Sequence, residues 1–170
     1  MRPPTDDDLV AAARRLGRQL TERGWQMAAA ESCTGGMIGH VITQVPKSSD
    51  HFLGGIVSYS DAVKEELLGV SPRLLRQVGA VSAEVAEAMT AGVLTRFPAA
   101  QLAVAVTGIA GPDGGSEDKP VGLTYVAAAL RDGRAAVERH GWPHDRDGNK
   151  RASTLAALEL AARLTAGPAA

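Results

Sequence analysis

The stretch of sequence that decides the fold starts at residue 29 and reads Ala29-Ala30-Glu31-Ser32-Cys33-Thr34-Gly35-Gly36. It follows an apolar run from Trp25 to Ala30, typical of a buried strand, and precedes Met37 to Ile42, typical of the start of a helix. Two hydroxyls and a thiol therefore stand at a strand-to-helix turn, where two glycines allow a backbone or a ligand to come close. The free N–H groups of a helix start attract negative charge, so this turn offers a nucleophile beside donors for an oxyanion.

Helices and strands are expected to alternate along the rest of the chain. Helical spacing and capping residues predict helices over Asp6–Arg23, Gly35–Val45, Asp61–Leu68, Ser82–Arg96 and Asp147–Leu164, and a short one that opens at Ser71-Pro72. Apolar runs predict strands over Trp25–Ala30, Gly55–Tyr59, Leu102–Thr107, Gly122–Leu130 and Ala135–His140, the last two as a hairpin turning at Asp132-Gly133. The segment from Pro46 to Asp50 is expected to be a loop. Ala-rich helices beside Val-rich strands indicate the α/β class.

Composition narrows the class of protein further. A length of 170 residues suits one domain, expected over residues 6–165, with flexible termini at 1–5 and 166–170. A net charge of −1 argues against a nucleic-acid-binding surface, and no apolar run approaches the roughly 20 residues of a membrane span. The N-terminus has no apolar signal-peptide core, and the single cysteine excludes an internal disulfide. We expect a cytoplasmic protein.

The loop after the second predicted strand carries a lysine in an unfavourable place. It reads Ser58-Tyr59-Ser60-Asp61-Ala62-Val63-Lys64, and with Asp61 as N-cap, Lys64 lies in the first helical turn, where the helix dipole disfavours a cation. The same field, with some burial, would lower the pKa of Lys64 toward that of a useful base, and Tyr59 could orient it or relay a proton. The alternative is a solvated lysine paired with Glu65, Glu66 or Asp61, beside a tyrosine whose hydroxyl is in water.

A glycine-rich loop follows the most apolar predicted strand. It reads Thr107-Gly108-Ile109-Ala110-Gly111-Pro112-Asp113-Gly114-Gly115-Ser116-Glu117-Asp118-Lys119-Pro120. Such loops present backbone N–H groups to phosphates or carboxylates, although this one has neither the Walker ending nor the dinucleotide spacing, and a flexible turn is the alternative. In open α/β sheets ligands bind outside the carboxyl ends of the strands, so we expect the three loops to share one pocket.

Two further residues have competing interpretations. Arg146, at the start of the last predicted helix, suits an anion such as phosphate, and equally a surface ion pair with Asp147 or Glu138. Cys33 is a rival nucleophile to Ser32, although a cysteine is more often an inert buried residue. The histidines show no spacing that indicates a metal site.

The three segments together resemble the CinA C-terminal domain family. The matching stretches are Ala30–Gly36, Gly55–Ser60 with Lys64, Gly79–Ser82, Gly108–Ser116 and Lys119–Gly122, and the similarity runs from about Asp7 to Leu164. Because the larger N-terminal domain of full-length CinA is missing, the chain resembles the stand-alone members. Those are nicotinamide-nucleotide amidohydrolases, which deamidate nicotinamide mononucleotide to nicotinic acid mononucleotide and ammonia in pyridine nucleotide salvage.

The resemblance implies a fold, a site and partners. The implied fold is a single-domain three-layer α/β/α sandwich with a mixed, mostly parallel sheet. The implied catalytic residues are Ser32 as nucleophile, Lys64 as general base and Tyr59 as its assistant. Residues expected to bind the oxyanion or the substrate are Glu31, Cys33, Thr34, Gly35, Gly36, Thr107, Gly108, Ile109, Ala110, Gly111, Gly115, Ser116 and Arg146. No metal and no organic cofactor are implied, and a homo-oligomer, most simply a dimer, is expected, with no nucleic acid or membrane as partner.

Some of these assignments leave alternatives open. Glu31 would offset the charge of a pyridinium ring, cap the following helix or brace the glycine-rich loop. The family commonly has serine at the position of Thr107, and the threonine keeps the hydroxyl but adds a methyl group. A different class of function is a non-catalytic module that binds a nucleotide, or a partner linked to competence or DNA damage. The lysine at the unfavourable end of a helix argues against that class, because binding alone does not require it.

Overall fold

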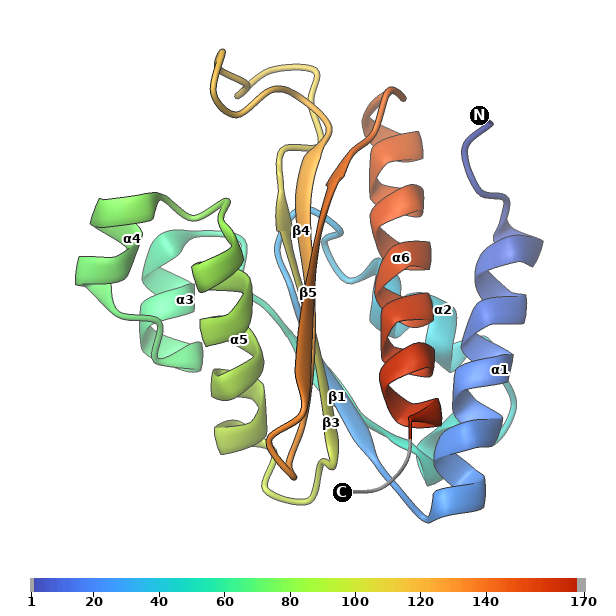
Figure 1. Ribbon diagram of the computed structural model, residues 1–170. Helices are drawn as coiled ribbons and strands as arrows, with labels where there is room; N and C mark the ends of the chain where they lie inside the picture. The colour runs from blue at the N-terminus through green and yellow to red at the C-terminus, as the bar shows by residue number, and fades with distance from the viewer. Residues whose placement is uncertain (1, 168–170) are drawn as a thin grey trace.

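A five-stranded sheet lies between two layers of helices in the computed structural model, which describes residues 2–167 (Figure 1). The strands are β1 (Met27–Glu31), β2 (Phe52–Val57), β3 (Leu102–Gly108), β4 (Leu123–Leu130) and β5 (Ala135–Gly141). The helices are α1 (Asp6–Arg23), α2 (Met37–Thr43), α3 (Asp61–Leu68), α4 (Pro72–Val78), α5 (Ala83–Arg96) and α6 (Arg146–Ala166), with a short 3₁₀ helix, η1, at Ser48–Asp50. Helices α1, α2 and α6 cover one face of the sheet, and α3, α4 and α5 the other.

The sheet is mixed, with the order β2-β1-β3-β4-β5. Strand β1 pairs in parallel with both β2 and β3, whereas β4 runs antiparallel to its neighbours β3 and β5. Only β4 is therefore reversed, and the other four strands point the same way. This confirms the predicted three-layer α/β/α sandwich with a mostly parallel sheet. The carboxyl ends of β1, β2 and β3 meet at one edge, beside the β3–β4 loop that extends beyond the sheet in Figure 1.

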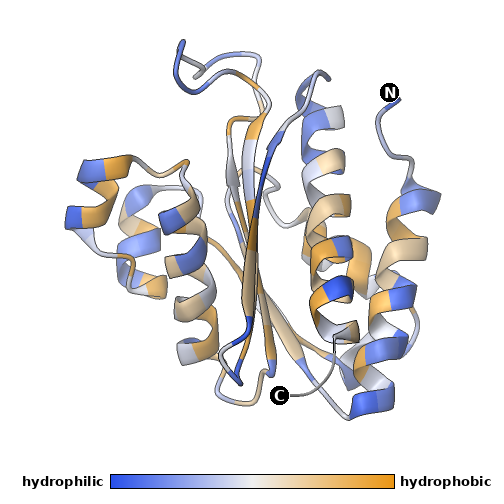
Figure 2. Ribbon diagram, viewed as in Figure 1, coloured by the Kyte–Doolittle hydropathy of each residue, from blue (hydrophilic) through white to orange (hydrophobic). Residues whose placement is uncertain are grey.

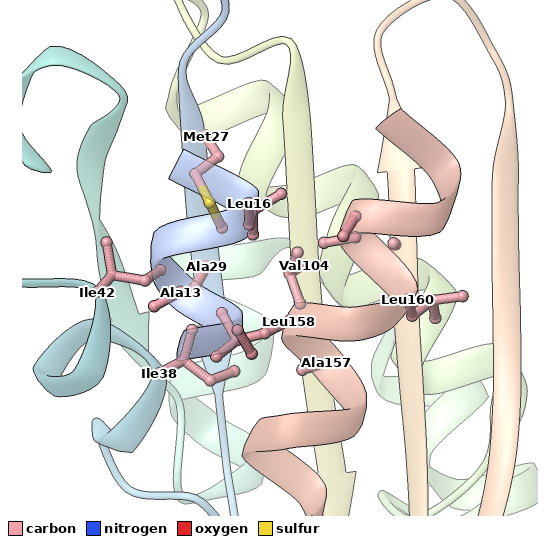
Figure 3. Close-up of a cluster of buried hydrophobic side chains, with 14 of the residues drawn as sticks. Ala13, Leu16, Met27, Ala29, Ile38, Ile42, Val104, Ala157, Leu158 and Leu160 are labelled. Carbon is pink, nitrogen blue, oxygen red and sulfur yellow. The ribbon is translucent and has the colours of Figure 1, made fainter. Parts of the chain in front are cut away.

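Small side chains on the central strands allow helices to pack closely on both faces. Ala29 and Val104 face a cluster formed with α1, α2 and α6, which Figure 3 shows around Leu16, Ile38 and Leu158. The alternate residues of the same strands, Ala28, Ala30, Ala103 and Ala105, face a second cluster around α5. Successive side chains of a strand point to opposite faces, so strands without polar positions are buried on both sides. The helices accordingly turn their apolar sides toward the sheet in Figure 2.

Element boundaries differ from the prediction where glycine or a cap decides them. Strand β2 covers Phe52–Val57, so the prediction of Gly55–Tyr59 was shifted, because its two glycines interrupt the apolar pattern. Helix α2 begins after Gly36, whose φ of 98° belongs to the left-handed region, and not at Gly35. Helix α3 is capped by Ser60 and not by Asp61. The predicted loop at 46–50 contains η1.

The ends of the described chain are held by helices. Thr5 caps α1 through Asp8, and α6 continues to Ala166. The predicted flexible termini extend to residues 1 and 168–170, which lie outside the described residues. Within the described part, no helix has the length and apolarity to cross a bilayer.

Replacing Gly92 by alanine tests the packing of α5 against the end of α3. A Cβ there would lie 2.1 Å from the carbonyl oxygen of Leu68, so one helix must shift. We expect Gly92→Ala to lower the free energy of unfolding by about 1–3 kcal/mol in urea denaturation. Gly141→Ala is the matched control because nothing lies within 4 Å of its Cβ position, and its change should stay within about 0.5 kcal/mol. Equal effects of the two variants would contradict this view of the contact.

Candidate active site

The ladder of the sheet places Ser32 between the ends of three strands. The Ser32 N–H donates to the carbonyl of Val106 at 3.0 Å, which extends the pairing of β1 with β3. On the other side, the Ser58 N–H donates to the carbonyl of Glu31 at 2.8 Å, which extends the pairing of β1 with β2. Ser32 is 7% exposed. The predicted nucleophile therefore stands at the shared carboxyl edge of the parallel strands, held by backbone bonds on both sides.

The carboxylate of Glu31 caps the start of α2. Its oxygens accept from the N–H groups of Gly36, Ile38 and Gly39, each at 3.0 Å. Gly36, the N-cap residue of α2, has no side chain with which to cap the helix. The carboxylate of Glu31 takes that role, and the N–H donors at the helix N-terminus stabilise its buried negative charge. Of the three roles open for Glu31, the structure shows the helix cap. The side chain does not reach the cavity described below.

The Glu31 cap leaves two free donors in the turn after Ser32. The N–H of Gly36 donates to Glu31, and that of Gly35 donates to the carbonyl of Ser32 at 3.1 Å. Gly35 and Gly36 are therefore already committed within the turn, in contrast to the expectation that they hold an oxyanion. Among the described residues, the N–H of Thr34 has no protein acceptor. The N–H of Cys33 has none except the sulfur of its own side chain.

Lys64 is buried with its amine beside Ser32. Its side chain is 1% exposed, and Nζ lies 3.3 Å from Ser32 Oγ. Nζ also donates to the carbonyls of Ser58 at 2.9 Å and Tyr59 at 3.4 Å, while the Asp61 carboxylate lies 3.7 Å away. The alternative prediction, a solvated lysine paired with a nearby carboxylate, is wrong about solvation because Lys64 is buried. The ion pair with Asp61, which was part of that alternative, is present. The amine thus makes two of its hydrogen bonds to backbone carbonyls, and a third side of it faces the Ser32 hydroxyl.

Burial shifts the pKa values of Lys64 and Cys33 in opposite directions. The pKa of Lys64 is lowered from that of a free lysine because burial penalises the ammonium form, and the charge of Asp61 opposes this shift. The Cys33 thiol is also buried, which raises its pKa to about 12. At neutral pH the lysine is therefore closer to an amine base, whereas the cysteine remains a thiol and a poor nucleophile.

Tyr59 and Arg146 meet at the mouth of the site. Arg146 donates through Nη2 to the Tyr59 hydroxyl at 3.1 Å and through Nη1 to the carbonyl of Gly111 at 2.6 Å. Tyr59 is 62% exposed, and it accepts a hydrogen bond from Lys64 through its backbone carbonyl, while its hydroxyl is bonded to Arg146. Neither of the expected ion pairs of Arg146 forms, because Asp147 pairs with Arg151, and Glu138 with Arg163 and His140. Arg146 thus joins the second and third loops.

The glycine-rich loop is fixed at its start by side chains from two directions. The Thr107 hydroxyl donates to the carbonyl of Ala80 at 2.8 Å. The buried Asn149 of α6 donates through Nδ2 to the carbonyl of Ala110 at 3.0 Å, next to the bond from Arg146 to Gly111. Sequence reasoning missed Asn149, because nothing in its local pattern indicates that α6 begins against this loop.

These loops enclose a cavity of about 260 Å³. Predicted site residues that line it are Ser32, Cys33, Tyr59, Lys64, Thr107, Gly108, Ile109, Ala110, Gly111 and Arg146. Predicted residues outside its lining are Glu31, Thr34, Gly35, Gly36, Gly115 and Ser116. Lining residues that the prediction missed are Asp61, Ala80, Val81, Asp113 and Gly114. Larger cavities lie elsewhere on the described part of the molecule, with volumes of about 480, 460, 320 and 290 Å³, and none of these four is lined by Ser32 or Lys64.

Comparison with known proteins assigns the family. Residues 10–165 match the model of the CinA C-terminal domain. The chain belongs to this family. It is 45% identical over 148 residues to the nicotinamide-nucleotide amidohydrolase PncC of Enterobacter agglomerans, and the match covers 87% of this chain and 90% of that protein. The name of this relative, which aligns with the chain over nearly the whole length of both proteins, describes a hydrolase that acts on a nicotinamide nucleotide.

Other relatives of this CinA-family protein carry less specific names. It is 47% identical over 154 residues to a CinA-like protein of Geobacter sulfurreducens, which covers 91% of this chain and 36% of that protein. The chain spans little more than a third of the length of several such relatives. The solved structure of the competence/damage inducible protein CihA from Agrobacterium tumefaciens has a TM-score of 0.89 at 37% identity and covers 96% of this chain and 98% of that one.

Metal ligands are not gathered in the described part of the chain, where no group of three or more histidine, cysteine, aspartate or glutamate side chains could hold an ion.

Replacing Glu31 by glutamine tests the cap of α2. The amide keeps the shape but presents an NH₂ group to N–H donors, so we expect the free energy of unfolding to fall by about 2–3 kcal/mol in urea denaturation. Glu22→Gln is the matched control, because Glu22 is exposed and should change stability by less than about 0.5 kcal/mol. A Glu31→Gln protein as stable as the control would show that the three bonds contribute little.

Proposed function

We propose that this protein deamidates nicotinamide mononucleotide to nicotinic acid mononucleotide and ammonia, with Ser32 as nucleophile and Lys64 as base. The observation that carries the proposal is the 3.3 Å approach of the buried Lys64 amine to the Ser32 hydroxyl at the base of a cavity. A nucleophile beside a base of lowered pKa is the arrangement that covalent acyl transfer requires. The named activity of the Enterobacter agglomerans relative supports the substrate.

Acylation begins with proton transfer from Ser32 to the neutral amine of Lys64. Because the carbonyls of Ser58 and Tyr59 take two N–H groups of the amine, its lone pair is directed toward the Ser32 hydroxyl. The alkoxide attacks the carboxamide carbon, which the cationic pyridinium ring makes more electrophilic. We assign the oxyanion to the N–H group of Cys33, which lines the cavity, since the N–H groups of Gly35 and Gly36 are committed within the turn.

The tetrahedral intermediate then breaks its C–N bond. The Lys64 ammonium gives its proton to the departing nitrogen, which leaves as ammonia, and an ester joins Ser32 to the nicotinoyl group. Lys64 next takes a proton from water, the hydroxide attacks the ester, and the ammonium returns a proton to Ser32 Oγ. The sum is one amide and one water converted to one acid and one ammonia, with the enzyme restored.

The ribose phosphate is assigned to the mouth of the cavity. Arg146 lies there with a guanidinium group suited to phosphate, although its present bonds to Tyr59 and Gly111 must be shared or exchanged when substrate binds. The carbonyl of Ala110 is drawn toward α6 by Asn149, so the following N–H, that of Gly111, points the other way. Arg146 and the Gly111 N–H are therefore the proposed anion contacts.

Ammonia release from nicotinamide mononucleotide tests the serine–lysine pair. We expect wild-type turnover, and a loss of about 10³-fold or more in Ser32→Ala and in Lys64→Met, because nucleophile and base act as a unit. Cys33→Ala is the control and should retain activity within about threefold, since its thiol stays protonated. Loss in Cys33→Ala with retention in Ser32→Ala would make the thiol the nucleophile. A folded wild type without release would favour the nucleotide-binding module.

The pH dependence of kcat/KM tests the base. Since the neutral amine is the active form, activity rises as pH increases through the pKa of Lys64, and this limb should lie below the ordinary range of lysine. The Asp61 carboxylate raises that pKa, so Asp61→Asn should move the limb to lower pH. Glu65→Gln, an exposed carboxylate change on the same helix, should leave it in place. A shift to higher pH in Asp61→Asn would contradict the assignment.

A further inference from the structure

The segment between α4 and α5 has an unusual set of bonds to its backbone. Four consecutive carbonyls, those of residues 78–81, each accept from a side chain. Lys119 Nζ donates to the carbonyls of Val78 at 2.6 Å and Val81 at 2.8 Å. The Ser82 hydroxyl donates to Gly79 at 3.1 Å, and the Thr107 hydroxyl to Ala80 at 2.8 Å. An irregular segment is thus fixed at every carbonyl, mostly by side chains from a distant part of the sequence.

Lys119 makes two of these four bonds from the far end of the glycine-rich loop. The loop itself closes around it, because the Ser116 N–H donates to the Lys119 carbonyl and the Lys119 N–H to the Ser116 hydroxyl. The approach of the amine depends on Gly79, where a Cβ would lie 3.0 Å from Nζ and φ is +75°. An ammonium group that donates to two carbonyls joins the two segments more strongly than neutral donors would.

The two segments form facing parts of the catalytic cavity. Ala80 and Val81 line it from the α4–α5 side, and residues from Gly108 to Gly114 line it from the glycine-rich loop. On its other side the loop is held to α6 by Arg146 and Asn149. Lys119 is 38 or more positions from its acceptors in sequence and does not line the cavity. Its contacts therefore fix the distance between two walls without touching what lies between them.

We propose that Lys119 is a positioning residue for substrate binding, which sets the shape of the cavity by fastening the glycine-rich loop to residues 78–82. The proposal rests on the proposed amidohydrolase function for its kinetic consequence, but the fastening itself is independent of that function. Loss of Lys119 leaves Ser32, Lys64 and Asp61 in place. The substrate should therefore bind less well, while the chemical step continues once it is bound.

Lys119→Met tests this, because methionine keeps much of the apolar stem and removes every donor. We expect the KM for nicotinamide mononucleotide to rise about tenfold or more, with kcat within about threefold of wild type and the pH limb of kcat/KM unmoved. Lys47→Met, the same change at an exposed lysine of the η1 loop, should leave KM unchanged. Lys119→Arg, which keeps the charge and can donate to two carbonyls, should recover most of the affinity.

Amide hydrogen exchange without ligand separates this proposal from the proposed function. Lys119→Met should raise exchange in residues 79–82 and in the glycine-rich loop together, whereas Lys47→Met should raise neither. Unchanged exchange at 79–82, or an unchanged KM in an active Lys119→Met protein, would overturn the proposal. If wild type releases no ammonia, the amidohydrolase assignment fails and the exchange experiment alone decides whether Lys119 joins the walls. If Lys119→Met does not fold, the same exchange measurement on Lys119→Arg against wild type decides it, and raised exchange there would contradict the proposed recovery.

Discussion

Pairing of β1 between β2 and β3 is the constraint on which the rest of the structure depends. Because all three strands run parallel, their carboxyl ends lie side by side, and the loops that follow them must share one edge of the sheet. The ladder continues one residue past β1, through the N–H of Ser32, and one residue past β2, through the N–H of Ser58 that donates to the carbonyl of Glu31. Ser32, the proposed nucleophile, is thus part of the sheet's hydrogen bonding.

The site combines this edge of the sheet with groups whose burial is costly. Lys64 is a buried amine, and Glu31 is a buried carboxylate one residue before Ser32. Backbone carbonyls accept hydrogen bonds from the Lys64 amine, and backbone N–H groups donate to the Glu31 carboxylate, so the burial of both groups is compensated. Buried ionisable groups are retained where function requires them, because apolar residues would satisfy the core at lower cost. Both buried groups therefore lie next to Ser32, the proposed nucleophile: Lys64 Nζ is 3.3 Å from its hydroxyl, and Glu31 precedes it in the sequence.

Much of the fold and the centre of the site follow from local sequence patterns. The α/β class, all six helices and the convergence of Ser32 with Lys64 could be predicted, because apolar runs, caps and strand-end loops are short-range signals. The limits of β2 could not, since Gly54 and Gly55 obscure its pattern. The cap formed by Glu31 was among the alternatives left open, whereas the contacts of Arg146 and Asn149 were beyond local reasoning, because each depends on how a helix start lies against a loop. Thr34, Gly35 and Gly36 were predicted to bind, but their turn serves the helix start, and none of them lines the cavity.

The buried thiol of Cys33, beside Ser32, has a consequence for oxidation by peroxides. Oxidation of cysteine by peroxides proceeds through the thiolate, and it is favoured by exposure. Cys33 is 6% exposed, and the pKa of its thiol, raised to about 12, keeps the thiolate fraction very small at neutral pH. We therefore expect Cys33, next to Ser32 in the sequence, to react slowly with peroxide. A serine nucleophile at this position, as proposed, would keep its activity under oxidation that inactivates enzymes with an exposed catalytic thiol.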